Sequence, residues 1–184
     1  MKTLKLYSIT AFVALLFIFS SSCKKDTVTP IVPPGTPDYV GTWSATAPFN
    51  SDYGVISMKD IKTFTDSIIT DKFQLEITTG LWIDYASMKS SLSVKGKIMN
   101  VTITELGVTE VNAFGIPTGV IKSYKAGTPE FDALILQLGQ AKLANARSFI
   151  AEYGVSGNQL TLKTDLNADG DYLDANETTV YTKQ

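Results

Sequence analysis

The chain of 184 residues contains no histidine, one cysteine and one arginine, Arg147. The lack of histidine excludes Ser-His-Asp and Cys-His catalysis, histidine general bases and nearly all zinc sites. Because the single cysteine, Cys23, lies near the N-terminus, the rest of the chain has no thiol nucleophile and no disulfide. Sixteen basic residues against eighteen acidic ones give a net charge of −2. A mildly acidic chain with one arginine predicts no nucleic-acid partner.

Carboxylates are the main chemical groups that remain. Isolated acids such as Asp84 and Glu105 do not show the paired spacing that acid–base catalysis by two carboxylates requires. Solvated surface acids are the simpler interpretation. We therefore expect a non-enzymatic protein with no catalytic residues.

The first 22 residues are typical of an export signal. Lys2 and Lys5 precede a mostly apolar stretch, 6–19, which is too short to cross a bilayer comfortably and fits a signal h-region. Three serines then lead to Cys23. This pattern resembles a bacterial lipobox. A serine-rich lipobox followed by lysines is similar to those of Bacteroidota lipoproteins. The resemblance implies that Cys23 is lipidated and becomes the mature N-terminus of an outer-membrane lipoprotein, facing the periplasm or the cell surface. The alternative is an ordinary signal peptide with an incidental cysteine.

A tether and one domain follow the signal. Residues 23–38 contain the cysteine and a segment with four prolines, which excludes helix and sheet and predicts a semi-rigid spacer. Residues 39–184 are long enough for one domain with its own core.

Short β-branched and aromatic runs with period-two alternation predict an all-β domain. We expect strands at 39–47, 54–64, 72–79, 82–94, 97–106, 119–124, 146–155, 159–164 and 178–182. Within this region, 58–68 is compatible with either helix or strand. Thr128, Pro129 and Glu130 form an N-cap, an N1 proline and an acidic first turn, which predicts a helix over 129–145.

Eight or nine short antiparallel strands need a closed barrel or a sandwich to protect their edges. The segment Tyr39-Val40-Gly41-Thr42-Trp43 resembles the G-x-W motif on the first strand of lipocalins and of the lipocalin-like domains of Bacteroidota lipoproteins. The resemblance implies a mostly antiparallel barrel of about eight strands in which Gly41 and Trp43 are structural. In many lipocalins an arginine near the last strand packs over this tryptophan, and Lys183 is the matching position here.

A barrel of this size either holds one small ligand or is filled by its own side chains. A small apolar ligand is the first functional hypothesis, with a mouth lined by Phe73, Trp82, Tyr85, Phe114 and Tyr124. The alternative is a non-enzymatic interaction module that docks a surface polysaccharide, a peptide or an outer-membrane partner. Exposed aromatic residues such as Phe49, Tyr53 or Trp82 would mark that function.

The acidic segment 165–177 carries the sharpest local motif. Its spacing D-x-N-x-D-G matches the first half of an EF-hand loop, but the twelfth position is an asparagine and no helices flank it. It is closer to a calcium loop between two strands. The candidate Ca²⁺ ligands are Asp165, Asn167, Asp169, Asp171, Asp174 and Glu177. The alternative is a solvated hairpin loop, since Asn, Asp and Gly are common turn residues.

Overall fold

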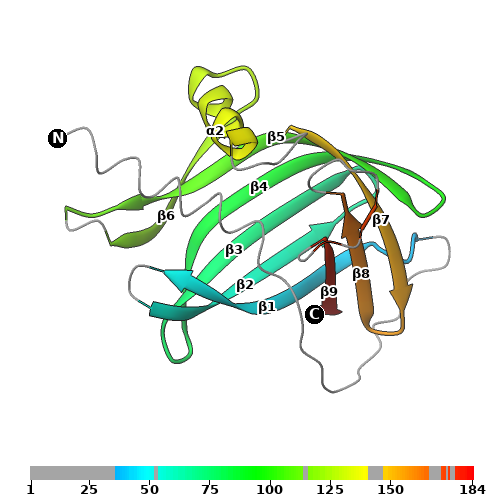
Figure 1. The fold of residues 1–184 in the computed structure, drawn as a ribbon, viewed down its shortest axis with the longest axis horizontal. Helices are drawn as coiled ribbons and strands as arrows, with labels where there is room; N and C mark the ends of the chain where they lie inside the picture. The colour runs from blue at the N-terminus through cyan, green and yellow to red at the C-terminus, as the bar shows by residue number, and fades with distance from the viewer. Residues whose placement is uncertain are drawn as a thin grey trace.

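The computed structural model describes residues 36–51, 54–113, 116–140, 147–165, 171, 172, 174 and 177–184. Within these ranges the chain forms nine strands and one helix (Figure 1). They are β1 Gly41–Ser51, β2 Gly54–Phe64, β3 Ile68–Thr78, β4 Leu81–Lys95, β5 Ile98–Val111, β6 Pro117–Lys125, α2 Pro129–Gln140, β7 Ser148–Ser156, β8 Gln159–Thr164 and β9 Thr178–Lys183.

The strands close into an antiparallel barrel of eight, which confirms the predicted all-β barrel. Their order is β4-β3-β2-β1-β9-β8-β7-β5, and β5 pairs again with β4 to complete the ring. The ninth strand, β6, is added outside the ring (Figure 1). The long strand β5 serves both neighbours, because its first residues, from Ile98 to Thr102, pair with β7 and its later residues, from Glu105 to Val111, pair with β6.

Each of the nine predicted strands corresponds to an observed one. The ambiguous region 58–68 is strand up to Phe64, a turn, and then the start of β3. Tight turns at Gly96 and Gly157 join β4 to β5 and β7 to β8, with φ angles of 63° and 57° that favour glycine. Residues 1–35, which include the signal, Cys23 and most of the tether, lie outside the described residues.

The predicted helix is present at Pro129–Gln140, and its expected continuation over 141–145 lies outside the described residues. Thr128 acts as its N-cap, because the backbone N–H of Phe131 donates to Oγ1 of Thr128 at 3.3 Å. Phe131 and Leu134 point from the helix into the apolar core between the strands. The helix therefore covers one end of the barrel interior.

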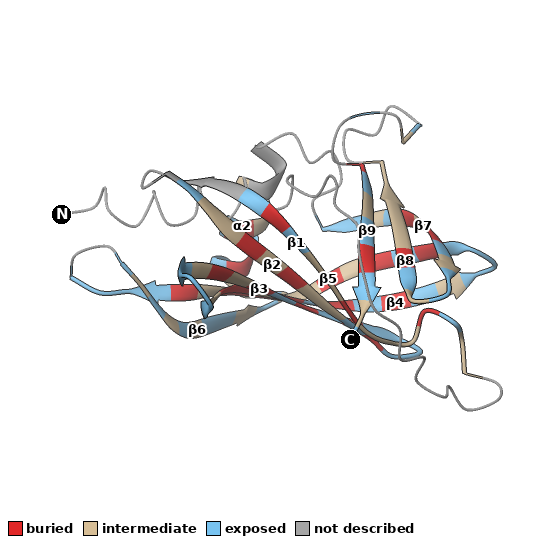
Figure 2. Cartoon of the chain, turned by 90° about the horizontal axis from the view of Figure 1, so that it is seen from below, coloured by how far each residue is buried: buried red, intermediate tan, exposed pale blue. Residues whose placement is uncertain are grey.

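Two apolar clusters lie in the interior, and Figure 2 shows buried residues along the strands that surround it. The first cluster lies beneath α2 and includes Met58, Phe73, Leu75, Tyr85, Ala86, Met88, Ile103 and Leu106. The second surrounds the start of β1 and includes Tyr39, Trp43, Phe64, Ile69, Leu92, Met99, Val101, Tyr153, Leu160 and Tyr181.

Trp43 lies at the centre of the second cluster and is fully buried. Its indole Nε1 donates to the carbonyl oxygen of Tyr39 at 2.8 Å. The ammonium of Lys183 lies 5.0 Å from the centroid of the Trp43 ring, within cation–π range. Gly41 has a φ of 134°, and a Cβ there would lie 3.3 Å from Cε of Lys183. Arg147 does not take this position over Trp43. Its guanidinium lies 5.7 Å from the centroid of the Phe131 ring.

Candidate functional site

The predicted mouth is only partly formed as expected. Phe73 and Tyr85 are buried in the cluster beneath α2, and Tyr124 packs against it. Phe114 lies outside the described residues. The expectation for Trp82 is wrong, because its ring faces the outside of the barrel, where the ammonium of Lys59 lies 4.0 Å from its centroid.

A β-bulge explains this error. The register between β3 and β4 shifts between Phe73 and Gln74, so that Phe73 pairs with Ala86 but Gln74 pairs with Asp84. Tyr85 is the extra residue, and Tyr85 and Ala86 both enter the core. Beyond the bulge the alternation is inverted, so Trp82 turns outward.

The acidic loop is described only in part. Asn167 and Asp169 lie outside the described residues. Phe49's side chain and Tyr53, two of the three aromatic residues expected to mark an interaction surface, lie outside them too, and the third, Trp82, is on the outer face. Asp171 and Asp174 are exposed, whereas Glu177 is 2% exposed and its Oε2 accepts a hydrogen bond from the backbone N–H of Asp174 at 3.2 Å. Across the described residues, no three His, Cys, Asp or Glu side chains form a group able to hold a metal ion. Calcium binding stays a prediction.

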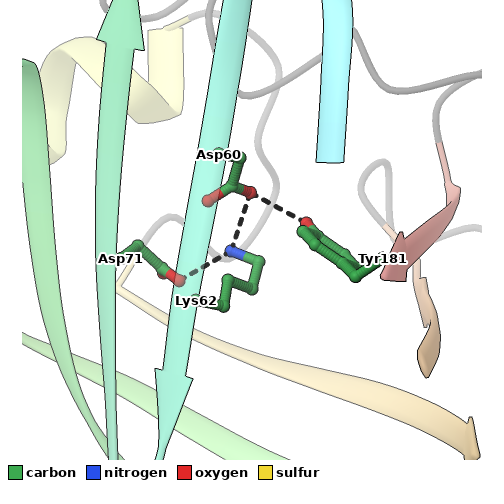
Figure 3. Close-up of polar contacts among 4 residues, drawn as sticks. All are labelled: Asp60, Lys62, Asp71 and Tyr181. Atoms are coloured by element: carbon green, nitrogen blue, oxygen red, sulfur yellow. Dashed lines mark hydrogen bonds and ion pairs between the residues drawn. The ribbon is translucent and has the colours of Figure 1, made fainter. Parts of the chain in front are cut away.

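A cluster that the sequence did not predict lies inside the barrel, where four polar side chains meet. Asp60 and Lys62 come from β2, Asp71 from β3 and Tyr181 from β9, and all four point toward one another (Figure 3). The Lys62 ammonium lies 2.8 Å from Oδ1 of Asp71 and 3.2 Å from Oδ2 of Asp60. The Tyr181 hydroxyl donates to the same Oδ2 of Asp60 at 2.8 Å.

Strand alternation places this cluster between the two apolar ones. On β2 the inward positions are Met58, Asp60, Lys62 and Phe64, so the charged pair separates a residue of one cluster from a residue of the other. On β3 Asp71 lies in the same way between Ile69 and Phe73. The cluster therefore forms a polar layer across the middle of an otherwise apolar interior.

Burial dominates the electrostatics of this layer. Asp60 and Asp71 are each 1% exposed. Burial, together with the nearby charge of Asp60, raises the pKa of Asp71 to about 6, although Lys62 opposes the rise. Burial lowers the pKa of Lys62, but the two carboxylates outweigh it and hold that pKa well above its ordinary value. Burial and then the charge of Asp60 raise the pKa of the Tyr181 hydroxyl.

Two buried polar atoms near this layer have no hydrogen-bond partner among the described residues. They are Oδ1 of Asp60 and Oγ of Ser90. Ser90 lies on β4 opposite Ile69, two residues along β3 from Asp71. A buried acceptor without a donor is destabilising by roughly 1–3 kcal/mol, and more when it is charged. The layer is therefore able to accept a hydrogen bond from a donor outside the strands.

The sequence held a signal for this cluster. Asp60 and Lys62 share the period-two phase of Met58 and Phe64, so two charged residues occupy inward positions of a strand. This pattern can be recognised only after the segment is assigned as a strand, and 58–68 is compatible with either helix or strand.

Within the described residues, no helix has the length and hydropathy needed to span a lipid bilayer. Comparison of the chain with protein-family profiles, with curated protein sequences and with solved structures returned no match.

Proposed function

We propose that this chain is a lipid-anchored lipoprotein of the bacterial outer membrane whose lipocalin-like barrel binds a small, largely apolar ligand in its interior. The anchor rests on the lipobox-like segment that ends at Cys23. The barrel has eight strands, and an interior of this size either holds one small ligand or is filled by its own side chains.

The observation that carries the binding function is the unpartnered Oδ1 of Asp60. Small-molecule sites are mostly apolar and contain a few polar groups that fix the orientation of the ligand. Here a polar layer with a free acceptor adjoins a cluster that contains Met58 and Met88. Methionine side chains are flexible and fill irregular space, so this side of the layer is the one best able to adapt to a bound molecule.

The test is to identify what the native protein carries. Full-length protein is extracted from its own membrane in mild detergent, and small molecules released on denaturation are analysed by mass spectrometry. Protein refolded from denaturant serves as the control. A molecule that is present at near-stoichiometric amounts in native protein and absent from refolded protein supports binding. Native protein that releases nothing above the refolded control contradicts it.

A second candidate function is docking to an envelope partner through one end of the barrel. The hairpins β1–β2, β3–β4 and β5–β6 end on the same side of the molecule (Figure 1). Their tips carry exposed aliphatic residues: Val55, Ile77, Leu81 and Ile116. Exposed apolar groups at one end of a domain are typical of an interaction site.

A photo-crosslinking residue placed at position 81 or at position 98 of the full chain in cells tests this docking function. Leu81 and Ile98 are both exposed aliphatic residues, at 52% and 37%, but they lie at opposite ends of the barrel. A crosslinked partner at position 81 and none at position 98 supports docking by the hairpin tips. Equal or absent crosslinking at the two positions contradicts it.

A further inference from the structure

The polar layer of Asp60, Lys62, Asp71 and Tyr181 has a fixed charge imbalance. Two carboxylates face one ammonium, which gives a net charge of −1 when all three groups are ionised. The Lys62 ammonium is directed at one oxygen of each carboxylate. The Tyr181 hydroxyl adds its donor to the Asp60 oxygen that Lys62 already contacts. The other oxygen of Asp60 is left as a buried acceptor without a donor.

We infer that the ligand of the barrel interior is an amphiphilic amine whose ammonium group donates a hydrogen bond to Oδ1 of Asp60. This inference rests on the binding function proposed above and names the chemistry of the ligand's polar end.

The charge balance selects a cationic head group over a neutral or an anionic one. A hydroxyl would supply the missing donor but would leave the buried negative charge. A carboxylate would add a third negative charge to a site that already holds two, and buried charges without partners are strongly destabilising. An ammonium supplies the donor and balances the charge, and charge-assisted hydrogen bonds are the stronger ones.

The surroundings of Asp60 select an apolar tail. Met58 is the next inward residue on β2, and Phe73 is the next inward residue after Asp71 on β3. Met88 of β4 is the register partner of Asp71 and belongs to the same cluster. The aromatic ring and two flexible thioether chains form the side of the layer that α2 covers, and a short alkyl chain matches their chemistry.

The experiment compares three probes that share an eight-carbon chain: n-octylamine, n-octanol and n-octanoate. Binding to the full-length protein in detergent is measured by calorimetry near neutral pH. We expect n-octylamine to bind at least tenfold more tightly than either of the other probes. The variant Asp60→Asn should lose this preference, whereas Asp84→Asn should keep it, because Asp84 lies on the outer face in an ion pair with Lys72.

A second measurement needs no variant. With ¹³C-labelled methionine methyl groups, bound n-octylamine should give intermolecular nuclear Overhauser effects to Met58. Met99 is the internal control, since it lies in the other apolar cluster around Trp43. Contacts to Met58 without contacts to Met99 support the inference even if Asp60→Asn does not fold.

The possible outcomes distinguish a failure of the amine inference from a failure of the proposed binding function. If n-octanol or n-octanoate binds as tightly as n-octylamine and contacts Met58, the interior site stands and the amine is wrong. If n-octylamine binds Asp60→Asn as well as the unaltered protein, or contacts no methionine methyl, its binding is a surface charge effect and the inference is overturned. If no probe binds and native protein releases no small molecule, the proposed binding function fails too.

Discussion

The stability of the barrel should fall as the pH rises through the range in which Asp71 ionises. Burial, followed by the charge of Asp60, raises the pKa of Asp71 from 3.8 to about 6 in the folded protein, despite the opposing effect of Lys62. Between these two values the folded state holds a proton that the unfolded state has released. The free energy of unfolding therefore decreases with pH over this window, because stability falls wherever the native state binds more protons.

The size of the effect follows from the two pKa values. The interval from 3.8 to about 6, at about 1.36 kcal/mol for each pH unit, corresponds to about 3 kcal/mol. The contribution is fully present below the unfolded pKa and is lost once the pH exceeds the folded one. Substituting Asp71 with asparagine removes the titration while it keeps the size of the side chain. The variant should therefore gain stability relative to the unaltered protein as the pH rises.

The assay is urea denaturation at steps from about pH 3 to about pH 7, since the window from 3.8 to about 6 lies inside that range. The difference in unfolding free energy between Asp71→Asn and the unaltered protein should rise by up to about 3 kcal/mol across these steps. Asp84→Asn is the control, because its carboxylate is 28% exposed and faces Lys72 on the outer surface. A pH dependence that Asp71→Asn shows and Asp84→Asn does not is assigned to the buried carboxylate.

A flat or falling difference for Asp71→Asn would refute the reasoning. It would mean that Asp71 is already ionised at low pH and that attraction to Lys62 exceeds the effect of burial. The polar layer would then tolerate its net negative charge, and the electrostatic case for a cationic ligand would be lost with it.

The remaining predictions concern the core, the anchor and the acidic loop. Trp43→Ala should lower the free energy of unfolding by about 3–5 kcal/mol in urea denaturation, as large-to-small changes at fully buried sites do; a loss below about 1 kcal/mol would show that the lipocalin-like placement of Trp43 is not what stabilises the barrel. Cys23→Ala should move the protein from the membrane pellet to the soluble fraction in cell fractionation, because the lipid would be lost; a variant that still partitions into detergent would contradict lipidation. Calcium at a few times its Kd should stabilise the protein by about 1 kcal/mol in thermal melts against a chelator, and Asp169→Ala should abolish the gain; equal midpoints with and without calcium would exclude the site.

The strands were predictable because their alternation is local. Gln74 and Glu76 alternate with Phe73 and Leu75, and the structure places the polar pair outside and the apolar pair in the core. Closure of the barrel could not be predicted from such a local pattern. It depends on β5 pairing with both β4 and β7, and pairings of this kind leave no periodic signal.

The candidate site was not predicted from the sequence for two physical reasons. The phase of β2 is ambiguous in the sequence, because Ile61, Phe64 and Ile68 fit a helical period. Thr63, Thr65, Ile68 and Ile69 favour a strand. The fourth member of the polar layer, Tyr181, is 121 residues away from Asp60 along the chain. The misplaced Trp82 has a related cause, because a single bulge inverts the faces of a strand beyond it.

The shortest seam of the barrel has a mechanical consequence. β1 and β9 are joined through the pairs Trp43 with Lys183 and Ser44 with Thr182, whereas β1 and β2 are paired from Gly41 to Ser51. Beside this short seam, the Tyr181 hydroxyl reaches past β1 to Asp60 on β2. This hydrogen bond links the last strand of the chain to the second. It stabilises the contact between β9 and β1, which has few backbone pairs. Detachment of β9 from β1 therefore has to break this hydrogen bond, which removes the Tyr181 donor from the buried carboxylate of Asp60.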